Sequence, residues 1–175
     1  MPRSASSSPA LPIAFVVLRI LIVLNWLMGA AILALLVAIP NAEWIMSAFK
    51  LSPSPDTDRL IMGLRAIAAL GLAVVLLQYV VFKRLIAIVE TVRAGDPFVA
   101  ANAIRLQTIA RALLGLQLLS LVIGAIAKAV SSPAHPVHVD AGFSANGWLA
   151  VLLTFLLARV FAEGTLMRDD LEGTV

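Results

Sequence analysis

The chain has 175 residues, of which 61% are hydrophobic and only 13% charged, with a net charge of +3 and a mean hydropathy of +1.01. A soluble domain is about 45–50% apolar and about 25% charged, so this chain has too little polar surface for water alone and needs lipid as part of its solvent. The absence of cysteine excludes disulfides, thiolate metal sites and cysteine nucleophiles, and two histidines argue against a histidine-rich redox or metal core.

Four apolar tracts follow one another along the chain, and each is near the ~20 residues that an α-helix needs to cross ~30 Å of hydrocarbon. The sequence therefore predicts an all-α integral membrane four-helix bundle, formed by a single domain over residues 1–175. The four spans, including their extensions into water, are predicted at about 12–40, 58–94, 97–130 and 144–171.

The first predicted helix starts at Pro12, where a missing N–H is harmless, and ends at Pro40-Asn41. In the loop that follows, Glu43 to Lys50 is predicted as a short interfacial helix, with Trp44 at the level of the lipid headgroups. Prolines then separate this segment from the second helix.

The second predicted helix has no breaker from about Asp58 to Ala94, and Gly95 suits the left-handed position that ends a helix. Asp96-Pro97 is suited to the N-cap and first turn of the third helix. Both helices are longer than the bilayer is thick, so we expect a helical hairpin that projects into the cytoplasm.

An outer loop is predicted at Ser131–Gly142, and Ser144 can cap the fourth helix. The second, third and fourth helices all continue past their apolar tracts with apolar residues three to four apart and charges between them. That pattern is typical of amphipathic helices in water. The three extensions are predicted to pack together as a short cytoplasmic stalk.

Basic residues mark the same end of all four tracts, at Arg19, Lys83 with Arg84, Arg111 and Arg159. The side of a membrane protein that is richer in lysine and arginine usually faces the cytoplasm, so both termini and the loop between the second and third helices are predicted inside. The basic excess fits this topology and anionic lipid headgroups, and no recognition-helix pattern indicates direct binding of nucleic acid.

Polar residues deep in the apolar tracts are Asn25, Gln78 and Gln117. They suit hydrogen bonds between helices, or the lining of a polar permeation path. No acidic residue lies in the middle of a predicted span, which argues against a proton-coupled transporter. The histidines and Asp140 of the outer loop lack a further zinc ligand, and no nucleophile–base pair or phosphate-binding loop is present. We therefore expect no catalytic residue, metal or cofactor, and no enzyme activity.

Two stretches resemble a bacterial family of small four-span membrane proteins of unknown function. One is Gly95-Asp96-Pro97-Phe98 followed by Asn102, Arg105 and Leu106, and the other is the tail 161–175 with Arg168. Members are often encoded beside a short helix-turn-helix regulator. The resemblance implies a multi-pass protein of the bacterial inner (plasma) membrane that acts as a partner of such a DNA-binding protein.

The leading hypothesis is a non-enzymatic membrane protein that binds a cytoplasmic protein through its stalk, in a regulatory or scaffolding role. The alternatives are a small channel or transporter and an accessory subunit of a larger membrane complex; the oligomeric state is not indicated. The candidate partner-binding residues are Arg93, Gly95, Asp96, Pro97, Phe98, Asn102, Arg105, Glu163 and Arg168.

Overall fold

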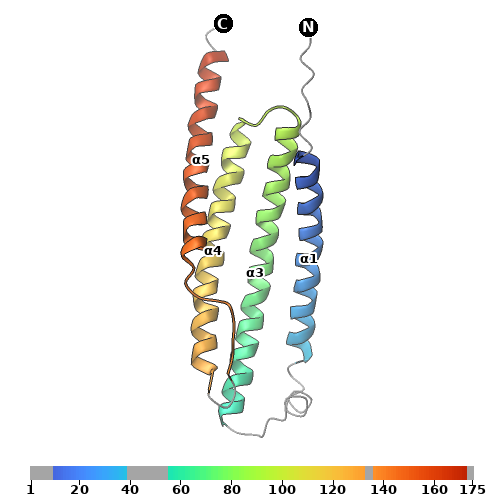
Figure 1. Ribbon diagram of the computed structural model, residues 1–175, viewed down its shortest axis with the longest axis vertical. Coiled ribbons are helices and arrows are strands. Elements are labelled where there is room, and N and C mark those ends of the chain that lie inside the picture. The colour runs from blue at the N-terminus through green and yellow to red at the C-terminus, as the bar shows by residue number, and fades with distance from the viewer. Residues whose placement is uncertain (1–9, 39–54, 133–135, 173–175) are drawn as a thin grey trace.

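The protein is all-helical in the parts that a computed structural model describes, namely residues 10–38, 55–132 and 136–172 (Figure 1). Four helices follow one another and each is long and apolar enough to cross a membrane, which confirms the predicted fold class. The interfacial helix predicted within 41–54 lies outside the described residues. The helices are α1 (Ala10–Ala38), α3 (Pro55–Arg93), α4 (Ala100–Val130) and α5 (Ala145–Glu172).

The helix ends follow local chemistry. Beyond α3, Gly95 takes a left-handed φ of +86° and donates its N–H to the Val92 carbonyl at 3.1 Å, while Asp96 donates to the Thr91 carbonyl at 3.1 Å. These two bonds form a Schellman motif, which satisfies carbonyls that a helix end leaves unpaired. At α5 the predicted cap is present, since the Gly147 N–H donates to the Ser144 hydroxyl at 3.2 Å.

The predicted start of the third helix at Pro97 is wrong by three residues. α4 begins at Ala100, and its N-cap residue, Val99, has extended backbone with no side-chain cap bond. The Pro97 carbonyl instead accepts a hydrogen bond from the Asn102 side chain at 2.8 Å. This bond holds the chain extended between the two helices, so residues 94–99 form a short loop that we call the tip loop.

The helices pack in chain order. α1 contacts α3, α3 contacts α4 and α4 contacts α5, whereas α1 meets neither α4 nor α5 among the described helices. Small residues allow the close approaches: Gly29 lies against Val75 between α1 and α3, and Gly115 lies against Leu77 between α3 and α4. The bundle is therefore open along one side, between α1 and α4.

Lipid is the only solvent that suits most of this surface. Of the described side chains of α1, only Asn25 and Gly29 are buried, and large apolar residues cover the rest of the helix. Such exposure is expected in hydrocarbon and is unfavourable in water. The start of α1, the tip loop and the end of α5 lie at one end of the molecule (Figure 1), as the hairpin prediction requires. Which end faces the cytoplasm stays a prediction from the basic residues.

α1 also lies close to the end of the molecule where the sequence predicts a stalk of the other three helices. The guanidinium groups of Arg19 and Arg93 both lie over the Phe15 ring, 5.2 and 5.5 Å from its centroid. α1 therefore accompanies α3 almost to the tip loop. α5 is the described helix that extends beyond the tip loop (Figure 1).

The loop predicted at Ser131–Gly142 is non-helical in its described residues, and the chain there turns back along the helix that it has just left (Figure 1). Gly142 donates its N–H to the Ser120 hydroxyl at 3.0 Å, and that hydroxyl lies 3.2 Å from the Gly142 carbonyl. Ser120 is ten residues before the end of α4, which corresponds to about 15 Å along the helix. Residues 136–143, which we call the returning segment, thus reach the middle of the uncharged stretch between Arg111 and Lys128.

Candidate functional site

Two of the predicted partner-binding residues, Asn102 and Arg105 of α4, belong to a partly buried polar network beside the tip loop. Asn102 is 0% exposed, and its amide Nδ2 donates to the Thr91 hydroxyl and to the Pro97 carbonyl, both at 2.8 Å. Arg105 Nη1 donates to Asn102 Oδ1 at 2.8 Å and to the Ala87 carbonyl at 3.0 Å. These bonds connect α3, the loop and α4. Asn102 and Arg105 therefore hold the shape of the tip with groups turned into the protein.

α5 packs against this tip through aromatic rings. The rings of Phe98 and Phe161 stack with centroids 5.2 Å apart and an interplanar angle of 29°. Phe98 also lies over Gly164, where an added Cβ would meet its ring at 3.6 Å. Phe98 as a whole is 48% exposed.

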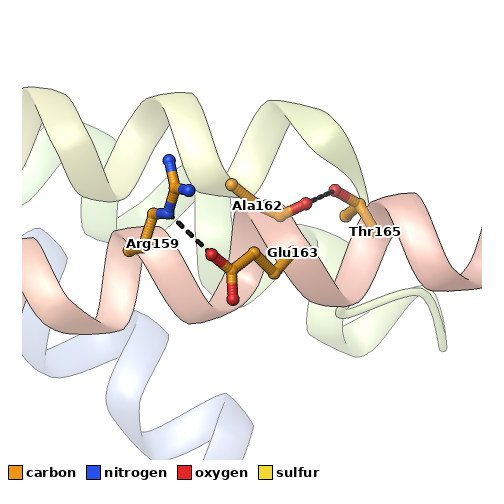
Figure 2. A network of polar contacts seen from close by, with 4 residues as sticks. All are labelled: Arg159, Ala162, Glu163 and Thr165. Atoms are coloured by element: carbon orange, nitrogen blue, oxygen red, sulfur yellow. Dashed lines mark hydrogen bonds and ion pairs between the residues drawn. The ribbon is translucent and has the colours of Figure 1, made fainter.

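Two of the charged candidates, Arg93 and Glu163, are on the surface. Arg93 is exposed at the end of α3. Glu163 forms an ion pair with Arg159, with 2.7 Å between Glu163 Oε1 and Arg159 Nε (Figure 2). Both partners of that pair are well exposed, at 77% and 52%. One turn farther, the Thr165 hydroxyl donates to the Ala162 carbonyl at 2.8 Å (Figure 2). Arg168 lies within α5, but its side chain is outside the described part of the structure.

A groove of about 340 Å³ runs between α4 and α5 near this end of the molecule. Ile104 and Gln107 line it from α4, and Arg159 and Ala162 line it from α5. Leu166 follows Ala162 by one helical turn, and it is 64% exposed. Sequence reasoning missed this groove, because the spacing of apolar residues indicates a helix face without showing which face a neighbour covers.

A second and larger cavity, of about 1000 Å³, lies beside α3 on the open side of the bundle. Apolar residues of α1, α3 and α4 form most of its wall, and the returning segment contributes Val139, Asp140 and Ala141. Two of the three predicted intramembrane polar residues, Gln78 and Gln117, share this wall with Ser120. The cavity is thus mostly apolar with a few polar groups, as small-molecule sites usually are.

The third predicted polar residue serves a different purpose. Asn25 is buried, and its Nδ2 donates to the Val75 carbonyl of α3 at 3.0 Å. It fixes α1 on α3 and is not among the residues that line the cavity. The interhelical role is therefore observed for Asn25, and a shared cavity is observed for the two glutamines.

Gln117 sits where α4, α5 and the cavity meet. Its side-chain amide lies so close over Gly147 that a Cβ there would have no room. Its Oε1 atom is buried and accepts no hydrogen bond from the described residues, and Trp148 Nε1 of α5 is a second buried polar atom without such a partner. Buried polar atoms are almost always paired in proteins, so these two atoms require an explanation.

Ser120 is a site residue that sequence reasoning missed, and Asp140 was considered only as a possible metal ligand of the outer loop. The sequence has no acidic residue in the middle of a predicted span, and Asp140, which lies outside those spans, reaches the cavity on the returning segment. One signal was available: in the fourth apolar tract, residues 148–158 approach the length of a span only together with residues 143–147 before them. Among the described residues no group of three potential metal ligands occurs, and His135 lies outside them.

Comparison with known proteins places the chain by family. The family described as "Protein of unknown function (DUF2975)" matches residues 37–175, which include α3, α4, α5 and both stretches on which the resemblance rested. Neither the curated proteins nor the solved structures include a match. The predicted resemblance to a family of unknown function is confirmed, and the neighbouring regulator stays a prediction.

Proposed function

The chain belongs to the DUF2975 family of unknown function, and we propose that this membrane protein is non-enzymatic and binds a cytoplasmic protein through the end that carries the tip loop. The role is regulatory or scaffolding, and a helix-turn-helix regulator is one such partner. The binding face is the α4–α5 groove and its continuation along α5.

Exposed apolar side chains beyond the basic residues carry this proposal. Ile104 is 65% exposed and lies seven residues beyond Arg111, on the side away from the apolar tract. Leu166 is 64% exposed and lies seven residues beyond Arg159. Seven residues correspond to about 10 Å of helix, which puts both side chains in water if the basic residues mark the headgroups. Exposed apolar patches in water are typical of protein-binding sites.

The groove suits one face of a partner helix. Recognition of a helix in a groove uses apolar side chains about one turn apart, and Ile104, Ala162 and Leu166 offer such contacts. The Arg159–Glu163 pair lies at the rim, where exposed charges influence the rate and orientation of encounter more than the affinity. The rigid tip network supports this face without taking part in it.

The test is capture of a cytosolic protein by the full-length chain in membranes, with Ile104→Ser and Leu166→Ser as test variants. Ile13→Ser is the matched control, because Ile13 is 61% exposed at the same end but on α1. We expect the partner to be lost with the double variant and kept with the control. Equal capture by both proteins contradicts the proposal. Phe98 and Arg105 are unsuitable test positions, because their substitution would disturb the tip itself.

The alternative of a channel or transporter receives less support. A permeation path would need polar groups along the whole depth of the membrane, but along α3 the cavity wall extends from Leu64 only as far as Gln78. Gln78 is five residues short of Lys83. A cavity that ends inside the protein favours binding over conduction.

A further inference from the structure

We propose that the cavity beside α3 is a binding site for an amphiphile with an apolar chain and a primary-ammonium head group, which enters from the lipid between α1 and α4. This site lies apart from the α4–α5 groove and does not depend on the proposed protein partner.

The walls of the cavity specify the apolar part of the ligand. Met28, Ile32 and Leu35 form one side from α1, while Leu64 and Ile67 form another from α3. A volume of about 1000 Å³ is at the upper end of the range for small-molecule sites and can hold a long hydrocarbon chain. Because α1 does not contact α4 in the described structure, the cavity opens sideways to the lipid.

The polar groups specify the head group. The carboxylate of Asp140 forms no hydrogen bond or ion pair with another described residue, and it lines the cavity on the returning segment. Gln117 Oε1 is a buried acceptor without a donor in the described structure. The Ser120 hydroxyl is already engaged with Gly142. Gln117 Oε1 lies against Gly147 of α5 and has almost no accessible surface, so Asp140 is the acceptor that a ligand in the cavity can reach. An exposed carboxylate in an otherwise apolar cavity suits a ligand that carries a positive charge and donates hydrogen bonds.

The depth of Asp140 strengthens this inference. The hydrogen bonds between Ser120 and Gly142 hold the segment near the middle of the apolar stretch of α4. An acidic group at membrane depth is costly unless it is paired or faces a cavity, and such groups usually serve a function. An ammonium with three N–H donors would pair with and neutralise the carboxylate.

The test measures binding of three probes to the full-length chain in phosphatidylcholine nanodiscs, whose own head groups have no N–H to donate. Dodecylamine has charge and donors, dodecyltrimethylammonium has charge alone, and dodecanoate has the opposite charge. We expect dodecylamine to bind about tenfold or more tightly than dodecyltrimethylammonium, since hydrogen bonds to charged groups are the strong ones. Dodecanoate should bind most weakly. Affinities within twofold of one another for all three probes overturn the proposal.

Variants locate the site. Asp140→Asn should weaken dodecylamine binding about tenfold, whereas Asp58→Asn, an exposed aspartate that does not line the cavity, should change it less than twofold. Val139→Trp, which fills the cavity from the exposed returning segment, should weaken all three probes. Unchanged dodecylamine binding in Asp140→Asn overturns the proposal even if the protein binds amines elsewhere.

Two further experiments show whether the ligand is a membrane lipid or a free amphiphile, and distinguish this proposal from that of the protein partner. In nanodiscs of equal phosphatidylethanolamine and phosphatidylcholine, native mass spectrometry should find phosphatidylethanolamine retained by the wild type and lost by Asp140→Asn if the ligand is a lipid. Dodecylamine binding without such retention assigns the site to a free amphiphile. Ile104→Ser with Leu166→Ser should leave dodecylamine binding unchanged, so failure of the protein-partner proposal and failure of this one are distinguishable.

Discussion

The tip loop and the returning segment are both connections between helices, and each contains a glycine with positive φ, +86° at Gly95 and +138° at Gly142. They use their polar groups in opposite ways. At the tip, Asn102, Thr91 and Arg105 satisfy one another inside the protein. In the returning segment, Asp140 faces a cavity and pairs with no described residue. Polar groups that hydrogen-bond to one another fix the shape of the tip, whereas an unpaired polar group beside a cavity is available to a ligand.

The largest expected loss of stability comes from a substitution that breaks the polar network at the tip. Asn102→Leu should lower the free energy of unfolding by about 3 kcal/mol, because it leaves the Thr91 hydroxyl, the Pro97 carbonyl and the Arg105 guanidinium with fewer partners in a buried site. Unfolding of the purified protein in detergent, followed by circular dichroism, measures this loss. Asn146→Ala on the exposed start of α5 is the control and should change stability by less than about 0.5 kcal/mol. If the two variants are equally stable, the network does not hold the tip.

A smaller effect is expected where the returning segment packs on α4. A Cβ at Gly124 would lie 2.6 Å from the Ala141 carbonyl oxygen, which is backbone and cannot rotate away, so Gly124→Ala should displace the segment at a cost of about 2 kcal/mol. Gly71→Ala is the matched control, because its Cβ would lie 3.4 Å from a flexible Ile32 side chain. Thermal unfolding compares the two variants. If the returning segment packs against Gly124, the Gly124→Ala variant should unfold at a clearly lower temperature than Gly71→Ala. Equal unfolding temperatures would contradict this packing.

The smallest effect is expected at the rim of the α4–α5 groove. Glu163→Gln removes the ion pair with Arg159, whose side chains are 77% and 52% exposed, so the free energy of unfolding should change by less than about 0.5 kcal/mol. The same unfolding measurement applies. A loss above about 1 kcal/mol would mean that this pair belongs to the structural part of the tip and not to its surface.

Much of the fold follows from the sequence because apolar length and glycine positions decide it locally. The four helices agree with their predicted ranges within a few residues, and both the Gly95 helix end and the Ser144 cap are as predicted. The start of α4 was misplaced because the Asn102 side chain, five residues away, competes for the Pro97 carbonyl. Such a side-chain bond has no local sequence signal.

The candidate sites were harder to predict because they depend on contacts between distant residues. Gln78 and Gln117 stood out as polar residues in apolar tracts, and they do share a cavity. Asp140 was considered only as a metal ligand, because a loop with prolines is expected in water. Ser120 was missed, because a serine is unremarkable in a helix. The bonds between Ser120 and Gly142, 22 residues apart, bring the loop alongside the apolar stretch of α4.

The depth of the returning segment is the central claim, and spin labelling measures it most directly. The chain has no cysteine, so single cysteines at Val139, at Val122 on the lipid face of α4 and at exposed Ser131 just after that helix can each carry one label. In nanodiscs, the ratio of oxygen accessibility to that of a water-soluble nickel chelate reports depth. We expect the ratio at Val139 to be close to that at Val122 and well above that at Ser131. A ratio at Val139 equal to that at Ser131 would place the segment in water and contradict both the returning segment and its cavity.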